Sequence, residues 1–213
     1  MDKRLFIFDL DGTIIDSRLG VTNSICYALS AYDINENPGN LTRFIGAPLR
    51  EIFGSHFGIT DPEQAVVKYR EYFAREGIYE NTVYPGIREV FEDLREAGKI
   101  MAVATTKATF YTNKILENLE LAKYFSYVSG DEMDGSLSKY GKREILRIVL
   151  DNLDPRRELP AVMIGDKEYD ITAAKELGID SIGLLYGYGS LEELEGATWI
   201  VRTTCELREL ILS

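Results

Sequence analysis

The stretch that decides the fold runs from Leu5 to Ile14 and reads Leu-Phe-Ile-Phe-Asp-Leu-Asp-Gly-Thr-Ile. Its first four residues form a continuous apolar run, which is typical of a strand covered on both faces of a sheet. Asp9 and Asp11 follow at once, and Gly12 then permits a sharp turn. A buried strand that ends in two carboxylates predicts a polar site at the carboxyl end of that strand.

Further apolar runs repeat along the chain at helix-length intervals. We expect strands at residues 100–104, 124–129, 161–164, 181–185 and 198–201. Amphipathic segments lie between these runs, and two of them end in glycine, at Gly98 and Gly178, shortly before a strand. Strands that alternate with helices predict an α/β fold, with a Rossmann-like parallel sheet core flanked by helices on both faces.

Residues 16–82 interrupt this alternation. The segment has helical patterning, with helices expected at 21–32 and 63–76, polar or glycine-bearing joints at 35–40 and 58–62, and no convincing buried strand. A chain of 213 residues is long enough for one full core and a small additional module. We therefore expect an inserted α-helical cap domain at 16–82, and a core domain formed by 1–15 and 83–213.

The composition excludes several classes of partner. With 24 basic and 35 acidic residues, the formal net charge of −11 argues against nucleic acid and against an anionic membrane surface. The two cysteines have no spacing typical of a zinc site or redox pair, and no segment approaches the roughly 20 apolar residues of a membrane span. These absences favour a cytoplasmic protein with a small soluble partner, and they leave the oligomeric state open.

Polar residues also gather next to the other predicted strands. In an open parallel sheet, ligands bind beyond the carboxyl ends of the strands, where such residues meet. Carboxylate oxygens are the ligands that Mg²⁺ prefers, while hydroxyl and ammonium groups bind phosphoryl oxygens. The sequence therefore predicts a site that holds Mg²⁺ and a phosphoryl group side by side. Besides Asp9 and Asp11, its candidates are Thr105, Thr106, Lys107, Lys139, Lys142, Asp166 and Asp170.

Four motifs occur in a fixed order: residues 9–14, residues 103–105, Lys142 before Glu144 and Ile145, and residues 165–170. Together they resemble the motifs of the haloacid dehalogenase superfamily, in its phosphatase branch, and most of all those of the phosphoglycolate phosphatase group. The resemblance covers nearly the whole chain. It departs at Ala108, close to where the family often has a proline, but this difference removes no chemical group.

The resemblance implies a Mg²⁺-dependent phosphatase that hydrolyses a small phosphomonoester through an aspartyl-phosphate intermediate. Asp9 would attack phosphorus, while Asp11 would protonate the leaving alcohol and later accept a proton from water. The metal would be held by the Asp9 carboxylate, the Asp11 backbone carbonyl and Asp166. Asp170 would orient metal-bound water from outside this ligand set.

The same resemblance implies contacts to the phosphoryl group from Gly12, Thr105, Thr106 and Lys142. The Lys142 ammonium would hold both the Asp9 carboxylate and the phosphate, although Lys107 or Lys139 could share that role. Arg43 lies in a segment that resembles the family's cap loop, which makes it a candidate for substrate specificity.

The substrate stays open at this point. Phosphoglycolate, a nucleoside monophosphate, a sugar phosphate and pyrophosphate all fit the motifs. A receiver-like signalling domain also combines acidic residues, a threonine and a lysine, but such domains are shorter and lack a helical insert. A non-catalytic relative that binds phosphorylated metabolites is a third alternative, and the intact Asp9, Asp11, Lys142 and Asp166 argue against it.

Overall fold

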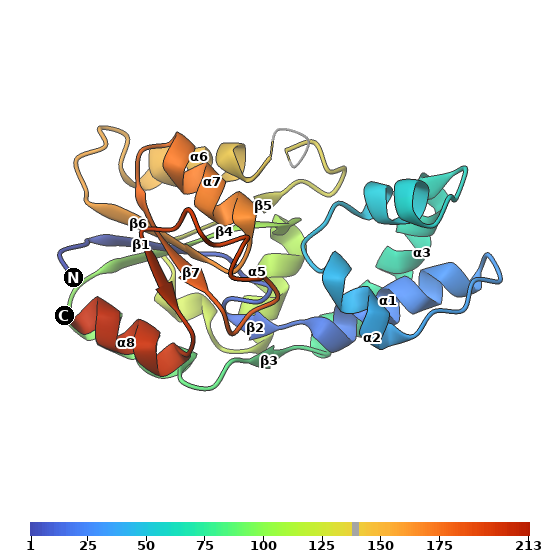
Figure 1. The fold of residues 1–213 in the computed structure, drawn as a ribbon, viewed down its shortest axis with the longest axis horizontal. Coiled ribbons are helices and arrows are strands. Elements are labelled where there is room, and N and C mark those ends of the chain that lie inside the picture. Colours follow the sequence, from blue (N-terminus) through green and yellow to red (C-terminus); the bar gives the residue numbers. More distant parts are fainter. Residues whose placement is uncertain (138–140) are drawn as a thin grey trace. The chain divides into compact units, whose positions relative to one another are not determined.

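The computed structural model describes residues 1–137 and 141–213 and divides the chain into two compact units. The first unit comprises Met1–Ile15 and Val83–Ser213, and the second comprises Asp16–Thr82. A parallel sheet with flanking helices forms the first unit, and helices dominate the second (Figure 1). The predicted fold class is confirmed: an α/β Rossmann-like core with an inserted α-helical cap domain.

The main sheet has six strands among the described residues, in the order β5-β4-β1-β6-β7-β8, and all its neighbours are parallel. Phe8 of β1 lies level with Val103 of β4 and with Ile164 of β6. The residues that follow these three strands therefore emerge at the same edge of the sheet. The strands are β1 (Leu5–Phe8), β4 (Ile100–Ala108), β5 (Tyr127–Asp131), β6 (Ala161–Gly165), β7 (Asp180–Leu184) and β8 (Trp199–Val201).

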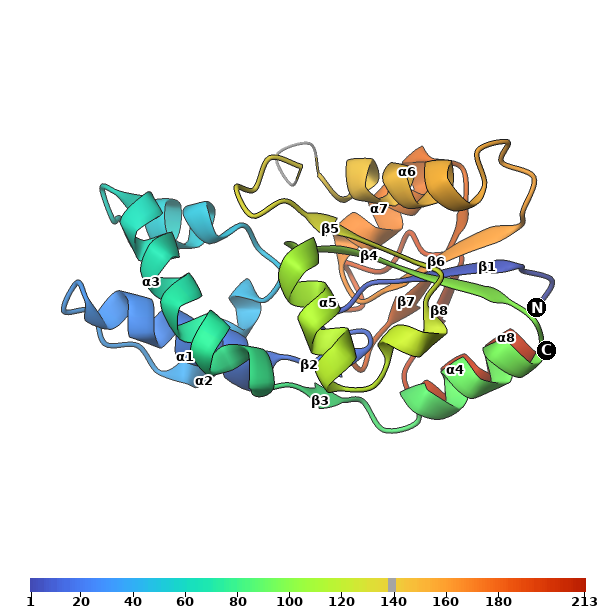
Figure 2. The same cartoon turned by 180° about the vertical axis from the view of Figure 1, so that it is seen from behind.

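Helices cover both faces of this sheet, as Figures 1 and 2 show from opposite sides. One face carries α6 and α7, which pack against each other, and the other carries α4 and α8, which also form a pair. The helical elements of the first unit that follow the insert are α4 (Ile87–Glu96), α5 (Thr109–Asn118), the 3₁₀ turn η4 (Ala122–Tyr124), α6 (Lys142–Leu153), α7 (Glu168–Glu176) and α8 (Thr204–Leu212).

Strand β1 lies at the centre of the core and serves both faces. Because side chains alternate along a strand, Leu5 and Ile7 join the apolar cluster formed with α6 and α7. Phe8, two positions from Phe6, makes an edge-to-face contact with Phe91 of α4, with ring centroids 5.2 Å apart. All four side chains of β1 are fully buried. Burial on two faces explains why this strand reads as an unbroken apolar run.

The two helix stops expected at Gly98 and Gly178 are present. Helix α4 ends at Glu96 and α7 ends at Glu176, and the two glycines have φ angles of 65° and 69°. The N–H of the residue after each glycine donates to the carbonyl five residues back, at 2.9 and 3.0 Å. These bonds satisfy carbonyls at the helix ends and turn the chain toward the next strand.

Two strand boundaries of the core differ from the expectation. Strand β4 continues past Ala104 to Ala108, with a shift of register against β5 between these two residues. The strand expected at 124–129 is displaced toward the C-terminus, because Tyr124 closes the turn η4 and packs its ring 5.4 Å from that of Phe91. Apolar residues thus mark the position of a strand better than they mark its ends.

The insert is built around a pair of packed helices, α1 and α3, close to the helices expected at 21–32 and 63–76. The rings of Tyr27 and Tyr72 lie 5.5 Å apart in this packing. The remaining elements are a short helix, two 3₁₀ turns and a turn of π-helix. The bounds are α1 (Arg18–Ser30), α2 (Pro38–Leu41), η1 (Thr42–Phe44), the π-helix η2 (Glu51–His56), α3 (Pro62–Arg75) and η3 (Gly77–Tyr79).

Two features of the insert were not expected. The joint at 35–40 contains the start of α2, where the Asn37 side chain accepts a hydrogen bond from the Gly39 N–H at 2.8 Å. Two-residue strands, β2 (Ile15–Asp16) and β3 (Thr82–Val83), pair where the chain leaves the first unit and returns to it. Such short elements carry too few residues to show a hydrophobic period.

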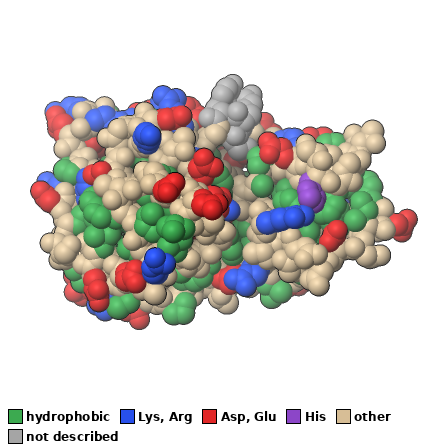
Figure 3. Space-filling view, in the orientation of Figure 1, with side chains coloured by type: hydrophobic (Ala, Val, Ile, Leu, Met, Phe, Trp, Pro, Cys, Tyr) green, Lys and Arg blue, Asp and Glu red, His purple; other side chains and the backbone are tan. Residues whose placement is uncertain are grey.

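Charge is dispersed over the face drawn in Figure 3, where acidic and basic side chains are interspersed. In the described part of the chain, no helix has the length and apolar character needed to cross a membrane.

Gly178→Ala is expected to lower the free energy of unfolding by about 1 kcal/mol, because an L side chain is strained at its φ of 69°. No atom lies within 4 Å of the added Cβ, so the loss would come from the backbone alone. Urea unfolding followed by circular dichroism measures the change. Gly196→Ala is the matched control, since its φ is not positive and its Cβ would meet Ile171 at an ordinary 3.5 Å. Equal losses in the two variants would contradict this account.

Candidate active site

Three buried aspartates converge at the carboxyl ends of β1 and β6. Asp9 follows β1, Asp166 follows β6, and Asp170 lies in the first turn of α7. Each offers a carboxylate oxygen, and these three oxygens lie within 4.8 Å of one another. The backbone N–H of Asp9 donates to the carbonyl of Ile164 at 2.8 Å, which ties the end of β1 to β6. The sheet register thus brings together residues that are far apart in sequence.

The buried ammonium of Lys142 lies against this cluster. Lys142 is the first residue of α6, and its side chain is completely buried. Its Nζ lies 2.7 Å from Oδ1 of Asp9 and 2.8 Å from Oδ1 of Asp170. The predicted proximity of Lys142 to Asp9 is therefore present, and Asp170 shares the same ammonium.

Burial sets the electrostatics of the cluster. It raises the pKa of Asp166 well above the ordinary value, and the charges of Asp9 and Asp170 raise it further. Burial likewise raises the pKa of Asp170 to about 7, with Asp9 adding to the shift and Lys142 opposing it. Burial acts to lower the pKa of Lys142, but the two carboxylates more than offset it, so that this pKa is raised. The site is short of positive charge.

A loop after β7 holds Asp166 in place. One carboxylate oxygen, Oδ2, accepts a hydrogen bond from the Tyr188 N–H at 2.7 Å, and Oδ1 accepts one from the Thr13 hydroxyl at 3.3 Å. A Cβ on Gly187 would lie 2.4 Å from the Cβ of Asp166, so the loop can approach only as glycine. The sequence analysis assigned no role to this loop. The sequence feature that could have indicated this loop is the run Tyr-Gly-Tyr-Gly at 186–189, which directly follows an apolar strand.

Gly12 has a packing role in the same region. Its φ is 77°, and a Cβ there would lie 2.2 Å from Oδ2 of Asp166. Its own N–H donates to the carbonyl of Ile15 at 2.9 Å. Glycine is thus required for the close approach of the two strand ends. Its contact with a phosphoryl group stays a prediction.

A second lysine pairs with the other motif aspartate. The Nζ of Lys107 lies 3.1 Å from Oδ2 of Asp11, and both side chains are about nine-tenths buried. Thr105 is buried, and its hydroxyl oxygen accepts a hydrogen bond from the Lys107 N–H at 3.3 Å; Thr106 is half-buried. Of the lysines that could share the role of Lys142, Lys107 therefore contacts Asp11, and Lys139 lies outside the described residues.

Arg43 makes its contacts within the insert. Its side chain is exposed, with Nη2 3.0 Å from Nε2 of His56 and the guanidinium 4.8 Å from the ring centroid of Phe44. The Phe44 and His56 rings are 4.5 Å apart. These neighbours fix the Arg43 side chain on the insert, and its role in substrate specificity stays a prediction.

The residues of the cluster fit a divalent cation. Three carboxylates face one ammonium, which leaves net negative charge in a buried space. Oδ1 of Asp11, two residues after Asp9, is also buried and has no hydrogen-bond partner within residues 1–137 and 141–213. Oxygen donors of this number and charge suit Mg²⁺, which usually takes one or two carboxylates and keeps several waters.

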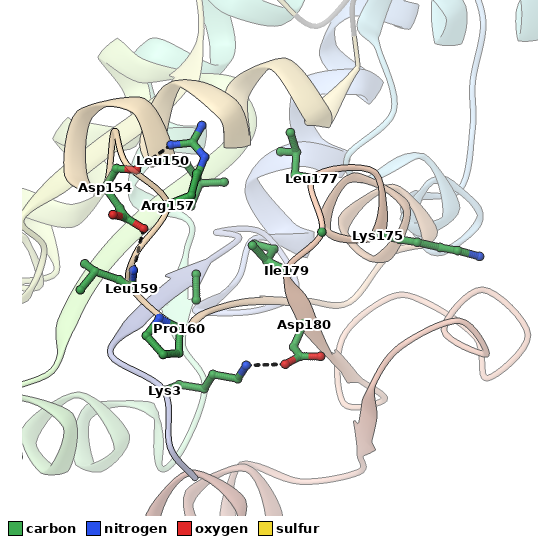
Figure 4. Close-up of a pocket in the computed structure, with 12 residues that line it drawn as sticks. Lys3, Leu150, Asp154, Arg157, Leu159, Pro160, Lys175, Leu177, Ile179 and Asp180 are labelled. Atoms are coloured by element: carbon green, nitrogen blue, oxygen red, sulfur yellow. Dashed lines mark hydrogen bonds and ion pairs between the residues drawn. The ribbon is translucent and has the colours of Figure 1, made fainter.

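A separate hollow of about 450 Å³ lies at the opposite edge of the sheet, where β6 and β7 begin (Figure 4). Four of its charged groups are engaged locally. Lys3 pairs with Asp180, the Arg157 side chain donates to the carbonyl of Asp154, and the Asp154 carboxylate accepts from the Leu159 N–H. These contacts tie the loops of this edge together, which is a structural role.

Comparison with known proteins agrees with the four motifs. Residues 6–184 match the family model described as haloacid dehalogenase-like hydrolase. The chain belongs to this family. The predicted recognition and the enzyme class are thereby confirmed.

The relatives of this haloacid dehalogenase-like hydrolase are named as enzymes that act on phosphate groups. A 5'-nucleotidase from Pseudomonas aeruginosa is 37% identical over 191 residues, covering 88% of this chain and 85% of the relative. The tyrosine-protein kinase PtkA of Mycobacterium tuberculosis is 33% identical over 213 residues, covering 98% and 72%. A phosphoglycolate phosphatase from Aquifex aeolicus is 30% identical over 191 residues, covering 88% and 87%.

Solved structures agree with the hydrolase fold. A crystal structure described as a predicted phosphatase from Clostridium acetobutylicum has a TM-score of 0.91 and 38% identity, and the alignment covers 100% of this chain and 99% of that one. Similarity at this level extends over the core and the insert alike.

We expect the metal-free hydrolase to lose stability as the pH rises from about 5 to about 8. The pKa of Asp170 is raised from 3.8 to about 7 in the folded protein. Folding therefore favours the protonated form, and that contribution is lost as the pH passes through the folded pKa. Thermal unfolding in chelator should show a loss of roughly 1 kcal/mol or more over this range.

Mg²⁺ should reverse the trend, because a cation binds the ionised carboxylates. Asp170→Asn removes one of the two carboxyl groups whose pKa is raised, so the profile in chelator should become less steep. A metal-free profile that rises toward pH 8 in the wild type would contradict the assignment.

Proposed function

We propose that this hydrolase is a Mg²⁺-dependent phosphatase that cleaves a small phosphomonoester through a phosphorylated aspartate, Asp9. The observation that carries the proposal is the buried cluster of three carboxylates with the Lys142 ammonium, 2.7 Å from Asp9. An acidic site of this kind suits transfer of a phosphoryl group, which asks mainly for positioning and for neutralisation of oxygen charge. The phosphatase names of the relatives support the same chemistry.

In the first half-reaction, a carboxylate oxygen of Asp9 forms a bond to phosphorus as the bond from phosphorus to the leaving oxygen breaks. Lys142 holds Asp9 through Oδ1, which favours a fixed direction of attack. Asp11 gives its proton to the leaving oxygen, so that an alcohol rather than an alkoxide departs. Its Oδ1, which has no hydrogen-bond partner in the described part of the chain, is suited to this transfer.

In the second half-reaction, water attacks phosphorus and the bond between phosphorus and Asp9 breaks. Asp11, now ionised, accepts the proton of that water and returns to its starting state. The products are the alcohol and inorganic phosphate, and Asp9 is regenerated. The Thr105 hydroxyl and the Lys142 ammonium are proposed to hold phosphoryl oxygens throughout, because Thr105 follows Ala104 at the same sheet edge as Asp9.

The metal is proposed to be bound by the Asp9 carboxylate, the Asp11 backbone carbonyl and Asp166. When bound, Mg²⁺ supplies positive charge that the phosphoryl oxygens and the carboxylates both need. Asp166 is prepared for this role by Tyr188 and Thr13, which fix the orientation of its carboxylate. Asp170 lies close enough to the cluster to be a further ligand or to orient bound water.

For the substrate, phosphoglycolate and a nucleoside monophosphate are the two leading candidates. The motif pattern resembles the phosphoglycolate phosphatase group, and a relative with this name is 30% identical. The relative named 5'-nucleotidase is 37% identical, which favours the second candidate. Sugar phosphates and pyrophosphate belong in the same screen. Release of inorganic phosphate from this panel, with and without Mg²⁺, tests the class and ranks the substrates.

A kinase-like or receiver-like activity is the alternative outcome of that screen. PtkA, which is 33% identical, is named a tyrosine-protein kinase. A phosphatase releases many phosphates per enzyme in water, whereas a receiver-like domain or a silent phosphate binder does not. Stoichiometric labelling of the protein without multiple turnover would therefore overturn the phosphatase proposal.

Asp9→Asn is expected to reduce turnover by at least about 10³-fold, since the amide has nearly the same shape but is a poor nucleophile. Phosphate release from the best substrate of the panel is the measurement. Asp2→Asn is the matched control, because Asp2 is exposed and should be silent. Turnover near the wild-type rate in Asp9→Asn, with the fold intact by circular dichroism, would remove Asp9 from its role.

Asp166→Asn is expected to raise the Mg²⁺ concentration for half-maximal activity by about tenfold or more, because a ligand charge is lost. Mg²⁺ titration of activity, together with isothermal titration of Mg²⁺ into the protein, measures the effect. The amide can still accept from Tyr188, so the loop contact is retained. An unchanged titration midpoint by both methods would exclude Asp166 as a ligand.

A further inference from the structure

Among the described residues, two lysines supply positive charge to the site. Lys142 contacts Asp9 and Asp170, whereas Lys107 contacts Asp11, with Nζ 3.1 Å from Oδ2. The side chains of Lys107 and Asp11 are 9% and 11% exposed, so this ion pair is largely withdrawn from water. Charge pairs in such surroundings hold their geometry more firmly than surface pairs do.

The backbone at Lys107 is fixed from two sides. The register of β4 against β5 shifts between Ala104 and Ala108, and irregularities of this kind re-aim side chains near active sites. The Lys107 N–H donates to the Thr105 hydroxyl oxygen at 3.3 Å. On the other side, Gly130 approaches so closely that a Cβ would lie 2.3 Å from the Lys107 carbonyl oxygen.

Among the described residues, the partner carboxylate is held at one oxygen. Oδ2 of Asp11 meets the Lys107 ammonium, while Oδ1 is buried and has no hydrogen-bond partner in this part of the chain. The terminal torsion of an aspartate is soft, so an ungripped carboxylate would sample a broad range of orientations. Gripping one oxygen sets the direction of the other.

We propose that Lys107 is a positioning residue that holds Oδ2 of Asp11 so that Oδ1 is presented to the leaving oxygen of the substrate. The inference rests on the proposed phosphatase function and assigns this residue a part in it. Lys107 neither gains nor loses a proton. In the acid form of Asp11 the proton is carried on Oδ1, while Oδ2 accepts a hydrogen bond from the Lys107 ammonium. The proton passes from Oδ1 to the leaving oxygen as the bond to phosphorus breaks, and misdirection of Asp11 would slow that step.

A different role for Lys107 would be direct binding of a phosphoryl oxygen. The two roles respond differently to the leaving group. An acid is needed for an alkyl phosphate, whose alkoxide is a poor leaving group, but hardly for 2,4-dinitrophenyl phosphate, whose phenolate leaves unaided. Loss of a phosphate contact would harm both substrates equally.

The test compares Lys107→Met with the wild type by kcat/KM, which reports the steps through cleavage of the first bond to phosphorus. We expect a loss of about 10²-fold for the alkyl phosphate and less than about threefold for the dinitrophenyl ester. Lys107→Arg retains the charge and should recover most of the alkyl phosphate activity. Lys114→Met is the matched control, since Lys114 is exposed on α5, and it should be silent.

A double-mutant cycle gives an independent readout. In the Asp11→Asn background, Lys107→Met should cause no further loss with the alkyl phosphate, because the residue acts through Asp11. Equal losses for the two leaving groups, or an undiminished loss in the Asp11→Asn background, would overturn the proposal in favour of phosphate binding. If Lys107→Met does not fold by circular dichroism, Lys107→Gln takes its place in the cycle with the same expectations.

The experimental outcomes distinguish a failure of the Lys107 positioning role from a failure of the proposed phosphatase function. A wild-type protein without multiple-turnover phosphate release would fail the phosphatase proposal itself. If the wild type does turn over, but Lys107→Met loses the same factor in kcat/KM with both substrates, only the positioning role of Lys107 is overturned.

Discussion

The site depends on an imbalance of charge among buried side chains. Asp9, Asp166 and Asp170 are brought within 4.8 Å of one another, and the Lys142 ammonium compensates only part of their charge. A buried carboxylate without a counter-charge is costly, which is reflected in the raised pKa values of Asp166 and Asp170. Much of the surrounding structure, including the glycine contacts at Gly12 and Gly187, serves to hold these groups together against their repulsion.

Much of this arrangement could be predicted from the sequence because parallel strands impose a common edge. The run ending at Phe8 identifies β1, whereas its register with Val103 and Ile164 comes from the structure. The carboxylates after β1 and β6 were therefore expected to meet. The position of Lys142 could be inferred from its motif, although the contact with Asp170 could not, because it depends on how α6 and α7 pack.

Other features were inaccessible to pattern reading. The extension of β4 through Lys107 depends on a shift of register against β5, which leaves no mark in the hydrophobic period. The loop that grips Asp166 acts through a backbone N–H, that of Tyr188, and backbone groups are the same in every residue type. In the insert, α2 depends on a local cap by Asn37 rather than on apolar spacing. Prediction from the hydrophobic pattern failed where the decisive contact was local or belonged to the main chain.

The central place of β1 has a consequence for the growing polypeptide. This strand is made before either of its neighbours in the sheet, since β4 begins at Ile100 and β6 at Ala161. The four large apolar side chains of β1 therefore have no partners, and both edges of the strand are unpaired, until β4 and β6 have been translated. Such a segment is a target for aggregation and for chaperones. The surroundings of Asp9, the proposed nucleophile, can thus be completed only after β6 has been translated, long after Asp9 itself.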